Sequence, residues 1–83
     1  MRVTVKYFAA IREDMGVSGE VVETNAANLA ELRDDLLSRS AAHAQSLARG
    51  RAVRMALNQV MSEECALLAE GAEVAFFPPV TGG

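Results

Sequence analysis

The chain has 83 residues, which allow one domain with a single core, and its formal net charge is −3. Its eleven acidic and eight basic side chains are interspersed, so the sequence lacks the concentrated basic stripe that nucleic-acid binding requires. It shows no signal peptide and no apolar run long enough to span a membrane, and we therefore expect a cytoplasmic protein without nucleic-acid or membrane partners.

The first third of the chain predicts two paired strands. Residues 2–8 alternate between apolar and other side chains, as a half-buried strand does. Residues 9–15 suit a short helix, and Gly16 is well placed to end it. Residues 20–24 have the pattern of a second strand, and its short distance from the first favours an antiparallel hairpin.

Two helices are expected next. The first begins at Asn28, whose side-chain oxygen can cap it, while Glu31 can reach back to the N–H of the cap. Arg33 is expected on the polar face of this helix. The apolar stripe of the helix consists of Leu29, Leu32, Leu36 and Leu37. A second, alanine-rich helix is expected over residues 41–49, with Ser40 as its cap.

The last third of the chain predicts the remaining strands. Residues 53–58 alternate as a third strand, Asn58-Gln59 favours a turn, and a short strand fits after the turn. The stretch from 62 to 68 has no pattern that favours either a helix or a strand. A final strand over residues 73–77 is stopped by Pro78-Pro79, because proline cannot donate ladder hydrogen bonds.

These elements predict an α+β domain over residues 1–77, followed by an extended tail over residues 78–83. The economical arrangement is a β-grasp, in which one mixed sheet packs on one main helix and a second short helix lies beside it. In a β-grasp sheet the first and last strands are adjacent and parallel.

The strand alternation predicts two aromatic side chains on the polar, solvent-facing side of this sheet. Phe8 shares its parity with the polar residues of the first strand, and Phe77 shares its parity with Glu73 in the last strand. Both are therefore expected on the solvent face as neighbours. Contiguous exposed aromatic side chains indicate a partner-binding surface; the alternative is that strand twist tucks both rings under a loop.

The tail has the composition of a reactive element. Pro78-Pro79 favours the polyproline II form, so six residues at about 3.1 Å each reach roughly 19 Å beyond the sheet. Gly82 and Gly83 carry no side chain, so they fit a narrow channel and leave the terminal carboxylate accessible. This carboxylate is ionised at neutral pH and is a competent nucleophile toward the α-phosphorus of ATP. A frayed terminus without function is the alternative.

The run from Val74 to Gly83, VAFFPPVTGG, resembles the C-terminal signature of the small, sulfur-carrying subunits of molybdopterin synthase. Residues 5–9, 29–32 and 56–59 match the same family in the same order, so the resemblance spans nearly the whole chain. Residues 62–69 match it poorly.

The resemblance implies a ubiquitin-like β-grasp fold and a defined chemistry. An E1-like enzyme would use ATP to adenylate Gly83, next to Gly82, and a sulfur-transfer system would convert it to a thiocarboxylate. The tail would then enter the large synthase subunit and give its sulfur to cyclic pyranopterin monophosphate, which forms the dithiolene of molybdopterin. Two sulfurs per product imply two small and two large subunits. The partner-binding positions implied by the resemblance are Phe8, Met61, Phe77, Pro78, Pro79, Val80 and Thr81.

No metal site, phosphate-binding loop or Ser-His-Asp arrangement is predicted, so we expect the chain alone to bind no cofactor and to catalyse nothing. Cys65 is expected to be a small buried apolar residue, and His43 a surface residue of the second helix. The alternatives in function are a related sulfur carrier for thiamine biosynthesis, a ubiquitin-like protein modifier, and an interaction module with an inert tail.

Overall fold

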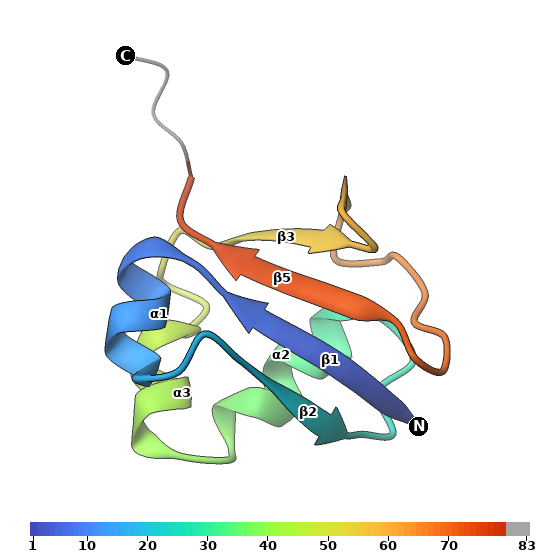
Figure 1. Ribbon diagram of the computed structural model, residues 1–83, viewed down its shortest axis with the longest axis horizontal. Coiled ribbons are helices and arrows are strands. Elements are labelled where there is room, and N and C mark those ends of the chain that lie inside the picture. Colours follow the sequence, from blue (N-terminus) through green and yellow to red (C-terminus); the bar gives the residue numbers. More distant parts are fainter. Residues whose placement is uncertain (80–83) are drawn as a thin grey trace.

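A computed structural model describes residues 1–79 and shows a mixed five-stranded sheet (Figure 1). The strands are β1 (Arg2–Tyr7), β2 (Gly19–Glu23), β3 (Arg54–Leu57), β4 (Val60–Met61) and β5 (Glu73–Phe77). Their order across the sheet is β2-β1-β5-β3-β4. The strand β1 pairs antiparallel with β2 and parallel with β5, while β3 pairs antiparallel with both β4 and β5. The central parallel pair is the one that the β-grasp prediction requires.

Three helices pack against one face of this sheet (Figure 1). They are α1 (Ala9–Met15), α2 (Leu29–Leu37) and α3 (Ala41–Ser46). The core between the two layers contains the predicted leucine stripe of α2 and the alternate apolar residues of the central strands. Its fully buried side chains include Leu29, Leu32, Leu36, Val3, Val5, Tyr7, Val74 and Phe76. Burial of this apolar surface is the main stabilising contribution to a domain of this size.

The ends of the helices follow the sequence signals closely. Gly16 ends α1 in the left-handed conformation at φ 77°, and its N–H donates to the carbonyl of Arg12. Asn28 caps α2, because its side-chain oxygen accepts from the N–H of Glu31 at 2.9 Å. One detail of the prediction is wrong. The Glu31 carboxylate accepts from the N–H of Ala27 at 3.0 Å, one residue before the cap.

Arg33 is buried, with only 5% of its surface exposed, so its expected place on the polar face of α2 is wrong. Its guanidinium donates to the carbonyls of Leu47 and Ala48, both at 2.7 Å, and to that of Arg51 at 3.2 Å. The same contacts explain why α3 ends at Ser46 and does not continue to residue 49. The carbonyls that follow the helix turn toward the guanidinium, which satisfies them in place of water.

Replacing Arg33 with methionine is expected to lower the free energy of unfolding by about 3 kcal/mol, since several partly buried carbonyls lose a charged donor. Denaturant unfolding measures the change. Arg2→Met is the matched control, because Arg2 lies exposed at the sheet surface with one ion pair to Glu23. Equal stability of the two variants would show that Arg33 does not organise the segment after α3.

Cys65 is exposed, so the prediction of a buried apolar residue is wrong. It lies in the irregular segment between β4 and β5, which crosses the surface and is anchored to the core by Leu68 and Ala72. The turn at Gly71 has φ 81°, a left-handed conformation that suits glycine. Within residues 1–79, no helix has the length and apolar character needed to cross a membrane.

Candidate functional site

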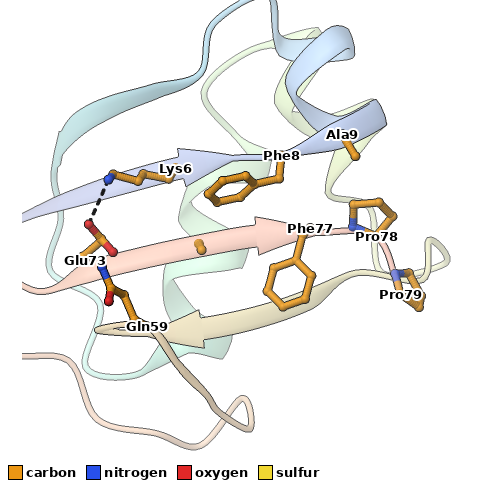
Figure 2. Close-up of a pocket in the computed structure, with 9 residues that line it drawn as sticks. Lys6, Phe8, Ala9, Gln59, Glu73, Phe77, Pro78 and Pro79 are labelled. Carbon is orange, nitrogen blue, oxygen red and sulfur yellow. Dashed lines mark ion pairs between the residues drawn. The ribbon is translucent and has the colours of Figure 1, made fainter. Parts of the chain in front are cut away.

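Phe8 and Phe77 both lie on the face of the sheet that the helices leave open, which confirms their predicted placement. The register pairs Tyr7 with Phe76 on the core side, so the next residue of each strand points the other way. Phe8 is 45% exposed and Phe77 is half-buried. Figure 2 shows the two rings side by side over the ends of β1 and β5.

The two rings border a groove of about 520 Å³ on this open face. An ion pair between Lys6 Nζ and a Glu73 carboxylate oxygen, 3.1 Å apart, closes one end of the groove (Figure 2). Pro78 and Pro79 line the other end. The complete lining consists of Lys6, Phe8, Ala9, Gln59, Glu73, Ala75, Phe77, Pro78 and Pro79. The site is therefore an apolar groove with polar groups at one end, which suits an apolar side chain of a partner protein.

Local backbone geometry shapes the groove at two points. Ala9 has φ 53°, an uncommon conformation for a residue with a side chain, and it lets α1 begin directly after Phe8 while the Phe8 N–H donates to the Phe76 carbonyl at 3.1 Å. Asn58 and Gln59 have φ 50° and 70°, as in a two-residue hairpin turn that matches the twist of β3 and β4. This turn brings Gln59 to the rim of the groove.

Met61 lies on the same open face but outside the groove. It pairs with Ala56, which in turn pairs with Ala75, so the three residues form one row across the sheet. Met61 is 60% exposed and lines an adjacent hollow of about 400 Å³ with Arg54. The structure thus gathers the predicted partner-binding residues 8, 61, 77, 78 and 79 on one side of the molecule. The predicted residues Val80, Thr81, Gly82 and Gly83 lie outside the described residues.

A polar network on the opposite face was not predicted from the sequence. His43 is 8% exposed, so the expectation of a surface residue is wrong. Its Nε2 lies 2.9 Å from Glu20 Oε2, and its Nδ1 lies 2.7 Å from Ser40 Oγ. The Tyr7 hydroxyl donates to the same Glu20 oxygen at 2.6 Å. Tyr7, Glu20 and His43 are far apart in sequence, so no local pattern could indicate their contacts.

This Ser-His-Glu contact has a structural role. Ser40 Oγ also accepts from the His43 N–H at 3.1 Å, so the serine caps α3. Tyr7 stacks on Phe76 with 6.3 Å between ring centroids and packs edge-on against His43. The network therefore fastens β2 and α3 to the central strands. Within residues 1–79, no cluster of three or more His, Cys, Asp or Glu side chains could hold a metal ion.

Glu20 makes the stability of this network depend on pH. Burial opposes ionisation of Glu20, but hydrogen bonds from Tyr7 and His43 outweigh it, so the pKa of Glu20 lies below its ordinary value. Burial, followed by the hydrogen bond to Glu20, raises the pKa of the Tyr7 hydroxyl, which stays neutral. Since the folded state favours the Glu20 carboxylate, its stabilising effect is present above the ordinary carboxyl pKa. The effect disappears as the pH falls through the lower folded-state value.

We expect Glu20→Gln to be less stable than the wild type near pH 7 and closer to it near pH 3. Urea unfolding of both proteins at the two pH values measures this difference. A difference that stays constant between the two pH values would contradict the assigned role of the carboxylate.

Comparison with known protein families places this geometry in context. The model of the ThiS family matches residues 5–83. The chain belongs to the ThiS family. The molybdopterin synthase sulfur carrier subunit of Haemophilus influenzae is 35% identical over 98% of this chain and 99% of that protein. The subunit of the same name from Escherichia coli is 36% identical over 98% of this chain and 99% of that protein.

Solved structures similar to this ThiS-family chain share its fold. A complex of subunits 1 and 2 of the Helicobacter pylori molybdopterin-converting factor contains a chain that is 27% identical, with a TM-score of 0.70 and full coverage of both chains. SAMP1 of Haloferax volcanii is 25% identical, with a TM-score of 0.78 and full coverage of both chains. With these matches, the expected ubiquitin-like β-grasp fold is confirmed.

Proposed function

We propose that this protein is the sulfur carrier subunit of molybdopterin synthase and that its reactive group is the C-terminal carboxylate of Gly83. The observation that carries the proposal is the apolar groove that ends at Pro78 and Pro79, two residues before Gly82-Gly83 in the sequence. A partner that covers the groove would receive the tail in its own active site. The full-length similarity to sulfur carrier subunits supports this function.

The proposed chemistry takes place entirely at the carboxylate. One carboxylate oxygen attacks the α-phosphorus of ATP on an E1-like enzyme, and pyrophosphate leaves. Hydrosulfide (HS⁻) delivered by a sulfur donor then attacks the acyl carbon, the bond from this carbon to the AMP oxygen breaks so that AMP leaves, and the terminal group becomes a thiocarboxylate. The carrier itself binds no cofactor and catalyses no step alone. We also propose that the carrier acts in the cytoplasm.

The proposed partner is the large subunit of molybdopterin synthase, in an assembly of two small and two large subunits. The Helicobacter pylori complex of subunits 1 and 2 supports this partner, since its fold matches this chain over its full length. Phe8 and Phe77 would bind an apolar side chain of the large subunit, Met61 would extend the contact, and the tail from Pro78 to Gly83 would enter the active site.

Reconstitution tests this function. Carrier with a thiocarboxylate end is mixed with the purified large subunit and cyclic pyranopterin monophosphate, and molybdopterin is measured. We expect product in proportion to the thiocarboxylate consumed, at two carriers per product. Consumption of the thiocarboxylate without formation of molybdopterin would contradict the proposal. Sulfur transfer that occurs only with the enzymes of thiamine biosynthesis would also contradict it.

The similarity to SAMP1 supports a second candidate, because related chains are named small archaeal modifier protein 1. In this case Gly83 would form isopeptide bonds with lysines of other proteins. Mass spectrometry of tryptic digests from cells that express the tagged chain separates the two functions. Trypsin cuts this chain last after Arg54, so a modified lysine would carry a branch of residues 55–83. Such branches, absent when the expressed chain lacks Gly83, would support the modifier function.

A further inference from the structure

The basic side chains divide into a paired group and two exceptions. The paired group, whose acidic partners lie within ion-pair distance, consists of Arg2, Lys6, Arg33, Arg39, Arg49 and Arg51. These are six of the eight basic residues, which leaves Arg12 and Arg54. Both are exposed, and neither makes an ion pair or a side-chain hydrogen bond with any residue from 1 to 79.

Both exceptions adjoin the aromatic groove. Arg12 lines a hollow of about 490 Å³ together with Lys6 and Phe8, which also line the groove. Arg54 is the cross-strand partner of Phe77 and lines the hollow that contains Met61. The two arginines therefore flank the groove, Arg12 beyond Phe8 and Arg54 beyond Phe77.

The acidic side chains near them do not neutralise these charges. Glu73 pairs with Lys6, and Glu20 is held by Tyr7 and His43. Glu63 lines the same hollow as Arg54 but lies outside ion-pair distance of it. In a chain of net charge −3, the groove thus has a positive charge on each side. Exposed, unpaired arginines add little to the stability of the fold, but they shape the field that an approaching protein meets.

We propose that the partner surface that covers the groove presents an apolar side chain with a carboxylate on each side, one for Arg12 and one for Arg54. The inference rests on the proposed function, since it describes the face of the large synthase subunit. Arginine suits this task because its planar guanidinium pairs with a carboxylate through two hydrogen bonds and also packs on aromatic rings. Because both arginines are at the rim, they act mainly on the rate and specificity of association.

The test compares the association of full-length carriers with the purified large subunit by stopped-flow fluorescence across a range of salt concentrations. We expect the double variant Arg12→Gln/Arg54→Gln to associate about ten-fold more slowly at low salt, with little change in the dissociation rate. The difference shrinks as salt rises, because screening removes the attraction in the wild type. Arg2→Gln is the matched control, since Arg2 lies on the same face at the far end of β1.

The outcomes separate this inference from the proposed function. Equal association rates and equal salt dependence of the double variant and the wild type, with normal binding of both, overturn the paired carboxylates and leave the function intact. A wild type that does not bind the large subunit overturns both. Slower association of Arg2→Gln to the same extent would show a general effect of net charge and would also overturn the inference.

Discussion

A variant that lacks Gly83 is expected to lose sulfur loading and sulfur transfer completely while it keeps the wild-type fold. The fold is unaffected because the core consists of residues between 3 and 76, all of which precede the tail in the sequence. The chemistry is lost because the terminal carboxylate moves back by one residue, about 3.3–3.6 Å, and no longer reaches the reacting atoms of its partners. Transfer assays and circular dichroism measure the two effects.

Gly83→Ala is the matched control for this deletion. It restores the length of the tail and the terminal carboxylate but adds a methyl group in the proposed channel. We expect partial loss of activity, since only glycine passes a channel that excludes side chains. Wild-type activity of the deletion variant would show that Gly83 is not the reactive residue, and loss of its circular dichroism signal would show that the tail supports the fold.

The second large effect is expected at Phe77. Phe77→Ala should weaken binding to the large subunit about 30-fold, or about 2 kcal/mol, because it removes an aromatic anchor at the centre of the proposed interface. Its effect on unfolding should stay below about 1 kcal/mol, since the ring is half-buried on the open face of the sheet. Calorimetric titration and denaturant unfolding measure these quantities.

The neighbouring residue provides the matched control. Phe76 is 0% exposed and stacks on Tyr7, so Phe76→Ala should lower the free energy of unfolding by about 3–5 kcal/mol. The two variants thus separate an effect on the free energy of unfolding from an effect on the affinity for the large subunit. If Phe77→Ala lowers stability strongly and leaves affinity unchanged, the aromatic groove is part of the core and not a docking surface.

Most of the fold could be predicted because its signals are local. Strand alternation placed Phe8 and Phe77 on the open face, and the parallel pairing of β1 with β5 made them neighbours. The cap at Asn28 and the turn at Gly16 required only short motifs. These parts of the site follow from the period of a strand and the order of the elements.

The errors at Arg33 and His43 have a common physical cause, which is contact over a long separation in sequence. Arg33 is buried because its guanidinium donates hydrogen bonds to carbonyls 14 to 18 residues later in the chain. His43 is buried because its Nε2 forms a hydrogen bond with Glu20, which lies 23 residues earlier in the chain. The local pattern places both residues on the exposed side of a helix, because it contains no information about the distant segment that covers them. For Cys65 the apolar neighbours in sequence predict burial, but this alanine-leucine segment crosses the surface as a loop and leaves the side chain exposed.

The most direct test of the sulfur carrier function is intact-mass spectrometry of the carrier after incubation with an E1-like activating enzyme, ATP and a sulfur donor. We predict a mass gain equal to the replacement of one oxygen by sulfur, and no gain for the variant that lacks Gly83. An unchanged mass, with enzymes that modify a known carrier in parallel, would contradict the proposed role of the C-terminal carboxylate.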